Sequence, residues 1–212
     1  MTTWLELAGM KGYYQSENIP VSLEGDGTLS VITWSQSVSP NHSVSIYTSL
    51  SFNGGNDWSE WKKADNGGKV PDITATLPLR NALLRYRAFV QTTEPLDLPL
   101  LKEIKLEFEP VLIFVNEGDT ACRPEIWITM NENGDFKLTN LSNSSEVFEF
   151  KGLIANETVY VNNEKEYIQS DINTIYRYKN FNDHYLSLPA GVNLFRVNGS
   201  AKVQWRSQFK LI

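Results

Sequence analysis

Cysteine and long apolar runs are both scarce in this sequence of 212 residues. The single cysteine, Cys122, cannot form an intramolecular disulfide or a zinc site built on several thiolates, so we expect folding in a reducing compartment. No stretch approaches the roughly 18 uninterrupted apolar residues of a membrane span, so membrane insertion is not expected. The start at Met1 has neither the basic nor the apolar region of a signal peptide, which predicts synthesis in the cytoplasm without one.

Basic residues and histidine are also in short supply. The chain has 19 Lys and Arg against 25 Asp and Glu, a net charge of −6. Phosphate backbones are bound by basic stripes, so this balance excludes nucleic acid as a partner. The two histidines, His42 and His184, lie in no Ser-His-Asp order and beside no nucleophile elbow. We therefore predict no catalytic residue and no enzymatic activity.

Signatures of metals and cofactors are missing as well. No glycine-rich phosphate loop precedes a helix, so no cofactor is predicted. The loops around Asp26, Asp57 and Asp119 carry the oxygen atoms that calcium prefers, but turn geometry accounts for their Asn and Asp content, and no metal-binding residue is predicted. The carboxylates are scattered and single out no pair for glycoside hydrolysis, which becomes the least favoured function class.

Alternation of apolar and polar residues dominates wherever a period can be read, which indicates strands with one buried face. In 43–52 the residues predicted to face inward are Val44, Ile46, Thr48, Leu50 and Phe52. Turn signals such as Asn53-Gly54-Gly55 and Asn198-Gly199 separate the alternating stretches. Residues 78–87 are predicted to be a loop that feeds a strand over 83–90 rather than a helix. The fold class predicted is all-β, with antiparallel β-sandwiches.

A domain boundary is predicted near Pro110. A regular strand covers 102–109, and a new apolar strand opens over 111–115. Each half has the length of a small β-sandwich. We therefore predict two domains, residues 1–110 and 111–212, joined almost without a linker.

The C-terminal half contains an ordered series of strand and turn motifs. Asn116-Glu117-Gly118-Asp119 leads through Arg123-Pro124 to Glu125-Ile126-Trp127-Ile128, and Gly134-Asp135-Phe136-Lys137-Leu138-Thr139-Asn140, Asn156-Glu157-Thr158 and Leu188-Pro189-Ala190-Gly191-Val192-Asn193 follow. In this order the motifs resemble the C-terminal domain of the distal tail proteins of siphophages. Asn156 and Ala190 depart from the family pattern, but both still permit a tight turn.

This resemblance implies a galectin-like or jelly-roll β-sandwich over residues 111–212. It also implies a structural protein of the virion, placed at the tail tip or baseplate, that serves as a docking platform in host attachment. Its partners would be other phage tail and baseplate proteins. The ring-forming N-terminal domain of that family is not recognisable here, so formation of a homo-oligomer is left open.

The N-terminal half carries a different motif, Ser51-Phe52-Asn53-Gly54-Gly55-Asn56-Asp57-Trp58, which looks like the Asp-box of sialidase propellers with Asn53 in place of Asp. One copy in a half of this length excludes a propeller. The favoured interpretation is a hairpin loop that caps itself through side-chain hydrogen bonds, with its Trp packed on the core. This half is similar to accessory β-sandwich modules of the carbohydrate-binding type.

That similarity points to a candidate carbohydrate site. Trp58 and Trp61 lie three residues apart in a stretch expected to be extended, which predicts that they face opposite sides of the sheet. If Trp58 closes the hairpin core, Trp61 faces solvent with Glu60 and Asn66 nearby, where a sugar ring can stack. The alternative, a Trp61 in the core or against the other domain, stays open. A carbohydrate-binding adhesin for host cell-surface polysaccharide is therefore the second function considered.

Overall fold

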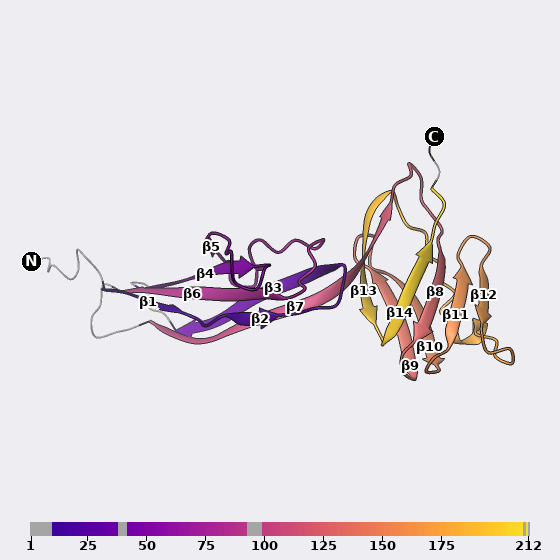
Figure 1. The fold of residues 1–212 in the computed structure, drawn as a ribbon, viewed down its shortest axis with the longest axis horizontal. Coiled ribbons are helices and arrows are strands. Elements are labelled where there is room, and N and C mark those ends of the chain that lie inside the picture. Colours follow the sequence, from indigo (N-terminus) through magenta and orange to yellow (C-terminus); the bar gives the residue numbers. More distant parts are fainter. Residues whose placement is uncertain (1–9, 38–41, 93–98, 210, 212) are drawn as a thin grey trace, which may run out of the picture. The chain divides into compact units, whose positions relative to one another are not determined.

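The computed structural model describes residues 10–37, 42–92, 99–209 and 211, and these residues form two compact units, Met1–Pro110 and Val111–Ile212 (Figure 1). We call them the N-terminal unit and the C-terminal unit. Every strand pairing described is antiparallel, and the helical content of the described ranges is one short turn, η1 (Tyr178–Asn180). The predicted all-β fold is confirmed.

The N-terminal unit contains a sheet in the order β1-β6-β4-β5, and a short strand, β2, also pairs with β6. Their bounds are β1 (Met10–Gln15), β2 (Ile19–Val21), β4 (His42–Ser51), β5 (Lys62–Lys63) and β6 (Ala82–Thr92). Strand β3 (Gly27–Ser37) lies beside β7 (Leu100–Asn116). The predicted strand over 83–90 lies within β6, as alternation of apolar and polar residues requires.

The core of the N-terminal unit forms from alternate residues of these strands. On β6, Ala82, Leu84 and Ala88 are buried, while Phe89 is exposed. Ile104, Leu106 and Phe108 of β7 pack against the same cluster. Because successive residues of a strand face opposite sides, β6 presents Arg85, Arg87 and Phe89 on the side away from this core.

Phe52 does not occupy the predicted inward position, since 46% of it is exposed. Strand β4 ends at Ser51, one residue earlier than the alternation suggested. Beyond that residue the chain enters a turn, where the period of 2 no longer decides which way a side chain faces.

The C-terminal unit contains two sheets. One has the order β10-β9-β13-β7 and the other β12-β11-β8-β14. Their bounds are β8 (Glu125–Met130), β9 (Gly134–Asn140), β10 (Glu146–Leu153), β11 (Thr158–Asn162), β12 (Tyr167–Ser170), β13 (Gly191–Asn198) and β14 (Ala201–Arg206). Both sheets contribute to one apolar cluster, which includes Ile126 and Ile128 from the second sheet and Phe136, Leu138 and Phe195 from the first.

Strand β7 is continuous through Pro110, whereas the sequence predicted two strands. Proline lacks an N–H and cannot donate to a ladder, so it is tolerated where the strand changes partner. The described pairing of β7 with β13 begins directly after it, at Val111 opposite Arg196. The partner change, rather than a break in the strand, therefore marks the boundary between the two units.

Two turns of the C-terminal unit depend on unusual backbone angles. Asn156, which departs from the family pattern, has a φ of 65°, and asparagine tolerates this left-handed region. Gly199 connects β13 to β14 with a φ of 103°, and a Cβ atom there would lie 2.3 Å from the carbonyl oxygen of Asp135. The turn that joins β13 of one sheet to β14 of the other therefore needs glycine for both its backbone angle and its close contact.

Candidate functional site

The loop after β4 is held by hydrogen bonds among its own side chains and backbone. The Ser51 hydroxyl donates to Asn53 Oδ1 at 3.0 Å and accepts from the N–H of Gly55 at 2.9 Å. Asn53 Oδ1 also accepts from the N–H of Asp57 at 2.9 Å, and Asn53 Nδ2 donates to Asp57 Oδ2 at 2.7 Å. The predicted self-capping loop is confirmed, and it fixes the path of the chain toward Trp58.

The prediction that the two tryptophans after this loop face opposite sides is wrong, because both rings contact Arg85. The guanidinium carbon of Arg85 lies 3.9 Å from the ring centroid of Trp58 and 4.9 Å from that of Trp61. Residues 52–61 belong to no strand, so the period of 2 does not apply to them. Trp58 is half-buried and donates its Nε1 hydrogen to the carbonyl of Gly55. It packs on Arg85, and the prediction that it packs on the core is wrong.

Arg87 continues this arrangement along β6. Its guanidinium carbon lies 4.1 Å from the ring centroid of Trp61 and 6.0 Å from that of Tyr13. Its Nε donates to the side-chain oxygen of Gln15 at 2.9 Å. Contacts between guanidinium groups and aromatic faces are attractive because the ring face carries negative charge. Trp61 thus contacts two guanidinium groups, which hold its ring on the side of the sheet that faces away from the core.

Three further aromatic rings lie on the same side of this sheet. Tyr13 of β1 stacks on Phe89 of β6 with centroids 5.8 Å apart, and Tyr47 of β4 meets Phe89 edge-on at 5.3 Å. The register explains the cluster, because Phe89 lies opposite Tyr13 on one neighbour and opposite Ser45 on the other. Tyr13 is 68% exposed and Phe89 is 40% exposed, so apolar ring surface remains open to a ligand.

A groove of about 450 Å³ runs across these strands, and we call it the outer groove. Aromatic rings line it together with two cations, two serine hydroxyls and an amide. The residues are Lys11, Ser43, Ser45, Tyr47, Trp61, Arg87, Phe89, Val90 and Gln91. Rings for stacking beside hydrogen-bonding side chains suit a hydrophilic ligand that has an apolar face, as sugars do.

The predicted carbohydrate residues lie in different places. Trp61 lines the outer groove, whereas Glu60 is exposed and is not among the lining residues. Asn66 accepts from the N–H of Trp34 at 2.9 Å and donates to its carbonyl at 2.8 Å, so its amide is engaged with β3. Arg87 and Phe89 were not predicted as site residues, although the alternation of β6 already placed them on the polar side of the strand.

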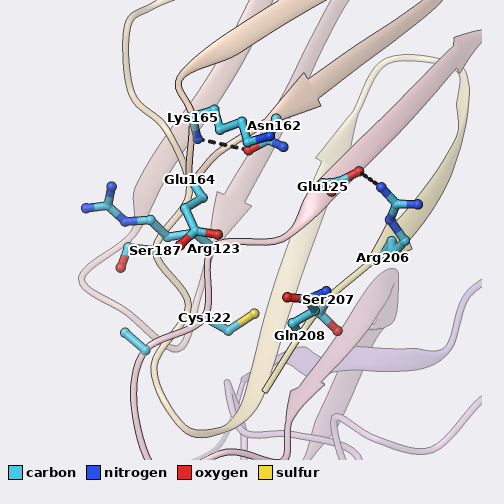
Figure 2. Close-up of a pocket in the computed structure, with 11 residues that line it drawn as sticks. Cys122, Arg123, Glu125, Asn162, Glu164, Lys165, Ser187, Arg206, Ser207 and Gln208 are labelled. Carbon is cyan, nitrogen blue, oxygen red and sulfur yellow. Dashed lines mark hydrogen bonds and ion pairs between the residues drawn. The ribbon is translucent and has the colours of Figure 1, made fainter. Parts of the chain in front are cut away.

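The C-terminal unit has a polar pocket of about 790 Å³ (Figure 2). Figure 2 shows Arg206 paired with Glu125 across neighbouring strands and the Lys165 N–H directed to Asn162 Oδ1, a distance of 2.9 Å. Cys122, which is buried, is among the residues that line this pocket. Burial raises the pKa of this thiol, so it stays protonated and is a poor nucleophile.

Beside this pocket lies the solvent-facing side of the sheet β12-β11-β8-β14, which we call the aromatic face. The rings of Trp127 and Tyr160 lie 5.0 Å apart, and Tyr167 follows at 6.3 Å from Tyr160. The guanidinium carbon of Arg206 lies 5.5 Å from the Trp127 centroid. The Tyr160 hydroxyl donates to Glu125 Oε2 at 2.9 Å. The alternation of Glu125-Ile126-Trp127-Ile128 could have shown that Trp127 shares the polar side of β8.

One carboxylate is deeply buried, and its contacts are those of a structural ion pair. Glu157 is 1% exposed and accepts from Arg177 Nε at 2.7 Å and from Arg177 Nη2 at 2.5 Å. Ser170 Oγ and the N–H of Ile154 complete its partners at 2.7 and 3.0 Å. Burial by itself raises the pKa of Glu157, but these hydrogen bonds outweigh it and the pKa falls. A general acid in glycoside hydrolysis needs the opposite shift.

Among the described residues, no three His, Cys, Asp or Glu side chains gather closely enough to hold a metal ion. Asp57, one of the loop acids, accepts instead from Asn53. The described part of the chain includes no helix with the length and apolar character of a membrane span.

Comparison with known protein families concerns the C-terminal half of the chain. The family model described as "Phage tail C-terminal domain" matches residues 108–206. Neither a search of curated proteins nor a search of solved structures finds a match. The match confirms the predicted resemblance to a phage tail protein family and supports a structural role in a phage tail. The galectin-like character of this half stays a prediction.

Proposed function

We propose that this chain, a phage tail structural protein by its C-terminal domain, is a docking platform at the tail tip or baseplate and acts in host attachment. The observation that carries the proposal is the aromatic face, in a domain that matches a phage tail family. The partners we propose for it are neighbouring proteins of the same tail. The place of the protein is then the virion, where copies of the chain meet these partners during assembly.

The composition of the aromatic face supports docking to protein. Trp, Tyr and Arg are the residues that most often dominate the binding energy of protein interfaces. Trp127 contacts both Tyr160 and Arg206 on the solvent-facing side of a single sheet. A sheet holds such side chains in fixed positions, so little conformational entropy is lost when a partner covers them. Glu125, which bonds both Tyr160 and Arg206, orients the polar ends of the cluster.

The first experiment locates the protein. We expect antibodies against the chain to label the distal end of the tail in electron micrographs of purified virions. Label along the whole tail tube, or absence of the protein from virions, would contradict a role at the tail tip.

The second experiment tests the surface. Trp127→Ala should reduce co-purification of the chain with other tail proteins by tenfold or more, since truncating a central interface residue costs about 2 kcal/mol or more. Tyr176→Ala is the matched control, because Tyr176 is 82% exposed and lies outside the aromatic face. Equal retention of tail proteins by both variants would show that docking uses a different surface.

A second candidate function is glycan binding by the N-terminal unit, and the outer groove favours it. Trp61 lines this groove beside Tyr47, with hydroxyls from Ser43 and Ser45. Trp61→Ala should weaken binding to host cell-surface polysaccharide while the unit stays folded, because Trp61 is only half-buried and belongs to no core cluster. Unchanged binding in a correctly folded Trp61→Ala variant would remove this candidate.

A further inference from the structure

We infer that the outer groove selects glycans that carry negative charge, and that Arg87 is the residue that recognises this charge. The ligand class is a sugar chain that bears carboxylate groups, as uronates do, or phosphate groups. This inference rests on the second candidate function, glycan binding by the same groove.

The charge of the outer groove differs in sign from that of the protein as a whole. The protein as a whole has a net charge of −6. Lys11 and Arg87 nevertheless line the outer groove, and none of the described residues that line it is an Asp or a Glu. A polyanion is repelled by the protein as a whole but meets a local excess of positive charge here. Such a local field favours an anionic ligand over a neutral one of the same shape.

Arg87 also has hydrogen-bonding capacity that the described residues do not use. Its Nε donates to Gln15, but no described residue accepts a hydrogen bond from its two terminal nitrogens, and no described carboxylate pairs with it. Those two nitrogens form the planar fork that binds carboxylate and phosphate in a bidentate way. The Trp61 ring, 4.1 Å from the guanidinium carbon, holds this fork in place. Trp61 is therefore a positioning residue for the charge.

The neighbouring Arg85 places a second positive charge close to Arg87. Arg85 and Arg87 lie two residues apart on the same side of β6 and both contact Trp61. Burial lowers the pKa of Arg85, and the like charge of Arg87 lowers it further. Arg85 Nε is buried without a described hydrogen-bond partner. An anion near this pair would offset repulsion that the free protein leaves unbalanced.

The remaining lining residues suit the sugar part of the ligand. Phe89 offers an exposed ring beside Tyr47, on which the apolar face of a sugar can stack. Ser43, Ser45 and Gln91 provide hydroxyl and amide groups for the sugar hydroxyls. A small inorganic anion would use only the arginine, so the groove as a whole fits an anion attached to a carbohydrate.

The experiment uses the full-length chain and two matched pairs of ligands in titration calorimetry. The first pair is an oligogalacturonate and the same oligomer with its carboxylates reduced to alcohols. The second pair is phosphorylated dextran and plain dextran. We expect the charged member of at least one pair to bind tenfold or more tightly than its neutral partner. The pair that shows this preference distinguishes carboxylate from phosphate as the source of the charge.

Variants assign the preference to Arg87. Arg87→Gln should lower affinity for the preferred charged ligand about tenfold or more, the effect of losing one charge-assisted bidentate contact, and should lower affinity for its neutral partner by a clearly smaller factor, so that the charge preference shrinks. Lys11→Gln, at an exposed position of the same groove, should give a smaller loss and guards against misfolding of the first variant. Lys69→Gln is the control, because it removes one exposed positive charge outside the groove.

The outcomes separate the two ideas. Equal affinity for charged and neutral ligands would overturn the inference and leave glycan binding standing. A charge preference that Lys69→Gln reduces as much as Arg87→Gln would also overturn it, because the effect would then be general electrostatics. Failure of all four ligands to bind would remove both the inference and the candidate function on which it rests.

Discussion

Glu157→Gln is the substitution that most directly tests how the C-terminal unit is held together. The Glu157 carboxylate accepts four hydrogen bonds, two from Arg177 and one each from Ser170 and the backbone of Ile154. Arg177 is itself only 6% exposed, and it also donates to the carbonyl of Gly152 at 3.1 Å. The substitution keeps the volume of the side chain but removes its negative charge. Arg177 is then left as a buried positive charge without a counter-ion.

The expected loss follows from this geometry. Removing one partner of a buried ion pair costs about 3–5 kcal/mol, because the remaining charge stays desolvated. The free energy of unfolding of a domain is typically about 5–15 kcal/mol, so Glu157→Gln should remove a large part of the stability of the C-terminal unit. Adding Arg177→Met removes the stranded charge. The double variant should therefore be more stable than Glu157→Gln alone by about 1 kcal/mol or more.

Hydrogen exchange in increasing urea, read by mass spectrometry, measures this effect for each unit separately. Peptides from β8 and β11 report on the C-terminal unit, and peptides from β4 and β6 in the same sample are the internal control. The reasoning would be refuted if Glu157→Gln cost less than about 1 kcal/mol. It would also be refuted if the double variant were no more stable than the single one.

The same pair predicts a dependence on pH. The pKa of Glu157 is lowered in the folded state, so its contribution to stability is fully present above the unfolded-state pKa of about 4.3. That contribution is lost as the pH falls from there through the folded-state pKa. The free energy of unfolding of the native protein should thus fall more steeply below about pH 4.3 than that of Glu157→Gln.

Three further predictions concern other parts of the chain. Gly199→Ala should destabilise the C-terminal unit by about 1–3 kcal/mol in urea unfolding, because its Cβ would clash with the carbonyl of Asp135 at a positive φ; an unchanged midpoint would contradict this. Asn53→Ala should destabilise the N-terminal unit by about 1–2 kcal/mol, because the N–H of Asp57 loses its acceptor, and a loss confined to the other unit would refute the assignment. Cys122 should react with a disulfide reagent far more slowly at pH 8 than glutathione does, since burial raises the pKa of its thiol; a comparable rate would show that the thiol is exposed.

Local pattern was sufficient for much of the fold. Alternation over 43–52 predicted a strand, since a period of 2 is imposed by the strand backbone whatever its surroundings. Turn residues such as Gly199 were recognisable because few residue types tolerate a positive φ. The motif series from Asn116 to Asn193 was sufficient to identify the phage tail resemblance, which the family match over residues 108–206 confirms.

Alternation also predicted which residues share one side of a strand. It did not predict which residues of neighbouring strands come into contact. Arg87 and Phe89 were recognisable as polar-side residues of β6 from the sequence alone. Their meeting with Tyr13 and Tyr47 depends on which strands become neighbours and in which register. That choice is made by long-range pairing and core packing, which a local pattern does not contain.

The two predictions about Trp58 and Trp61 were wrong for a related reason, since a local spacing rule was applied to a segment that is not a strand. The spacing rule for extended chain assigned them to opposite faces, but the self-capped loop takes the chain out of strand geometry and brings both rings to Arg85. The pairing of Glu157 with Arg177, twenty residues apart, likewise has no local signature. The sequence by itself thus determined the strands, the turns and the family of the C-terminal half. Only the tertiary structure decided which side chains meet, because the outer groove, the aromatic face and the buried ion pair are all built from contacts between segments distant in the chain.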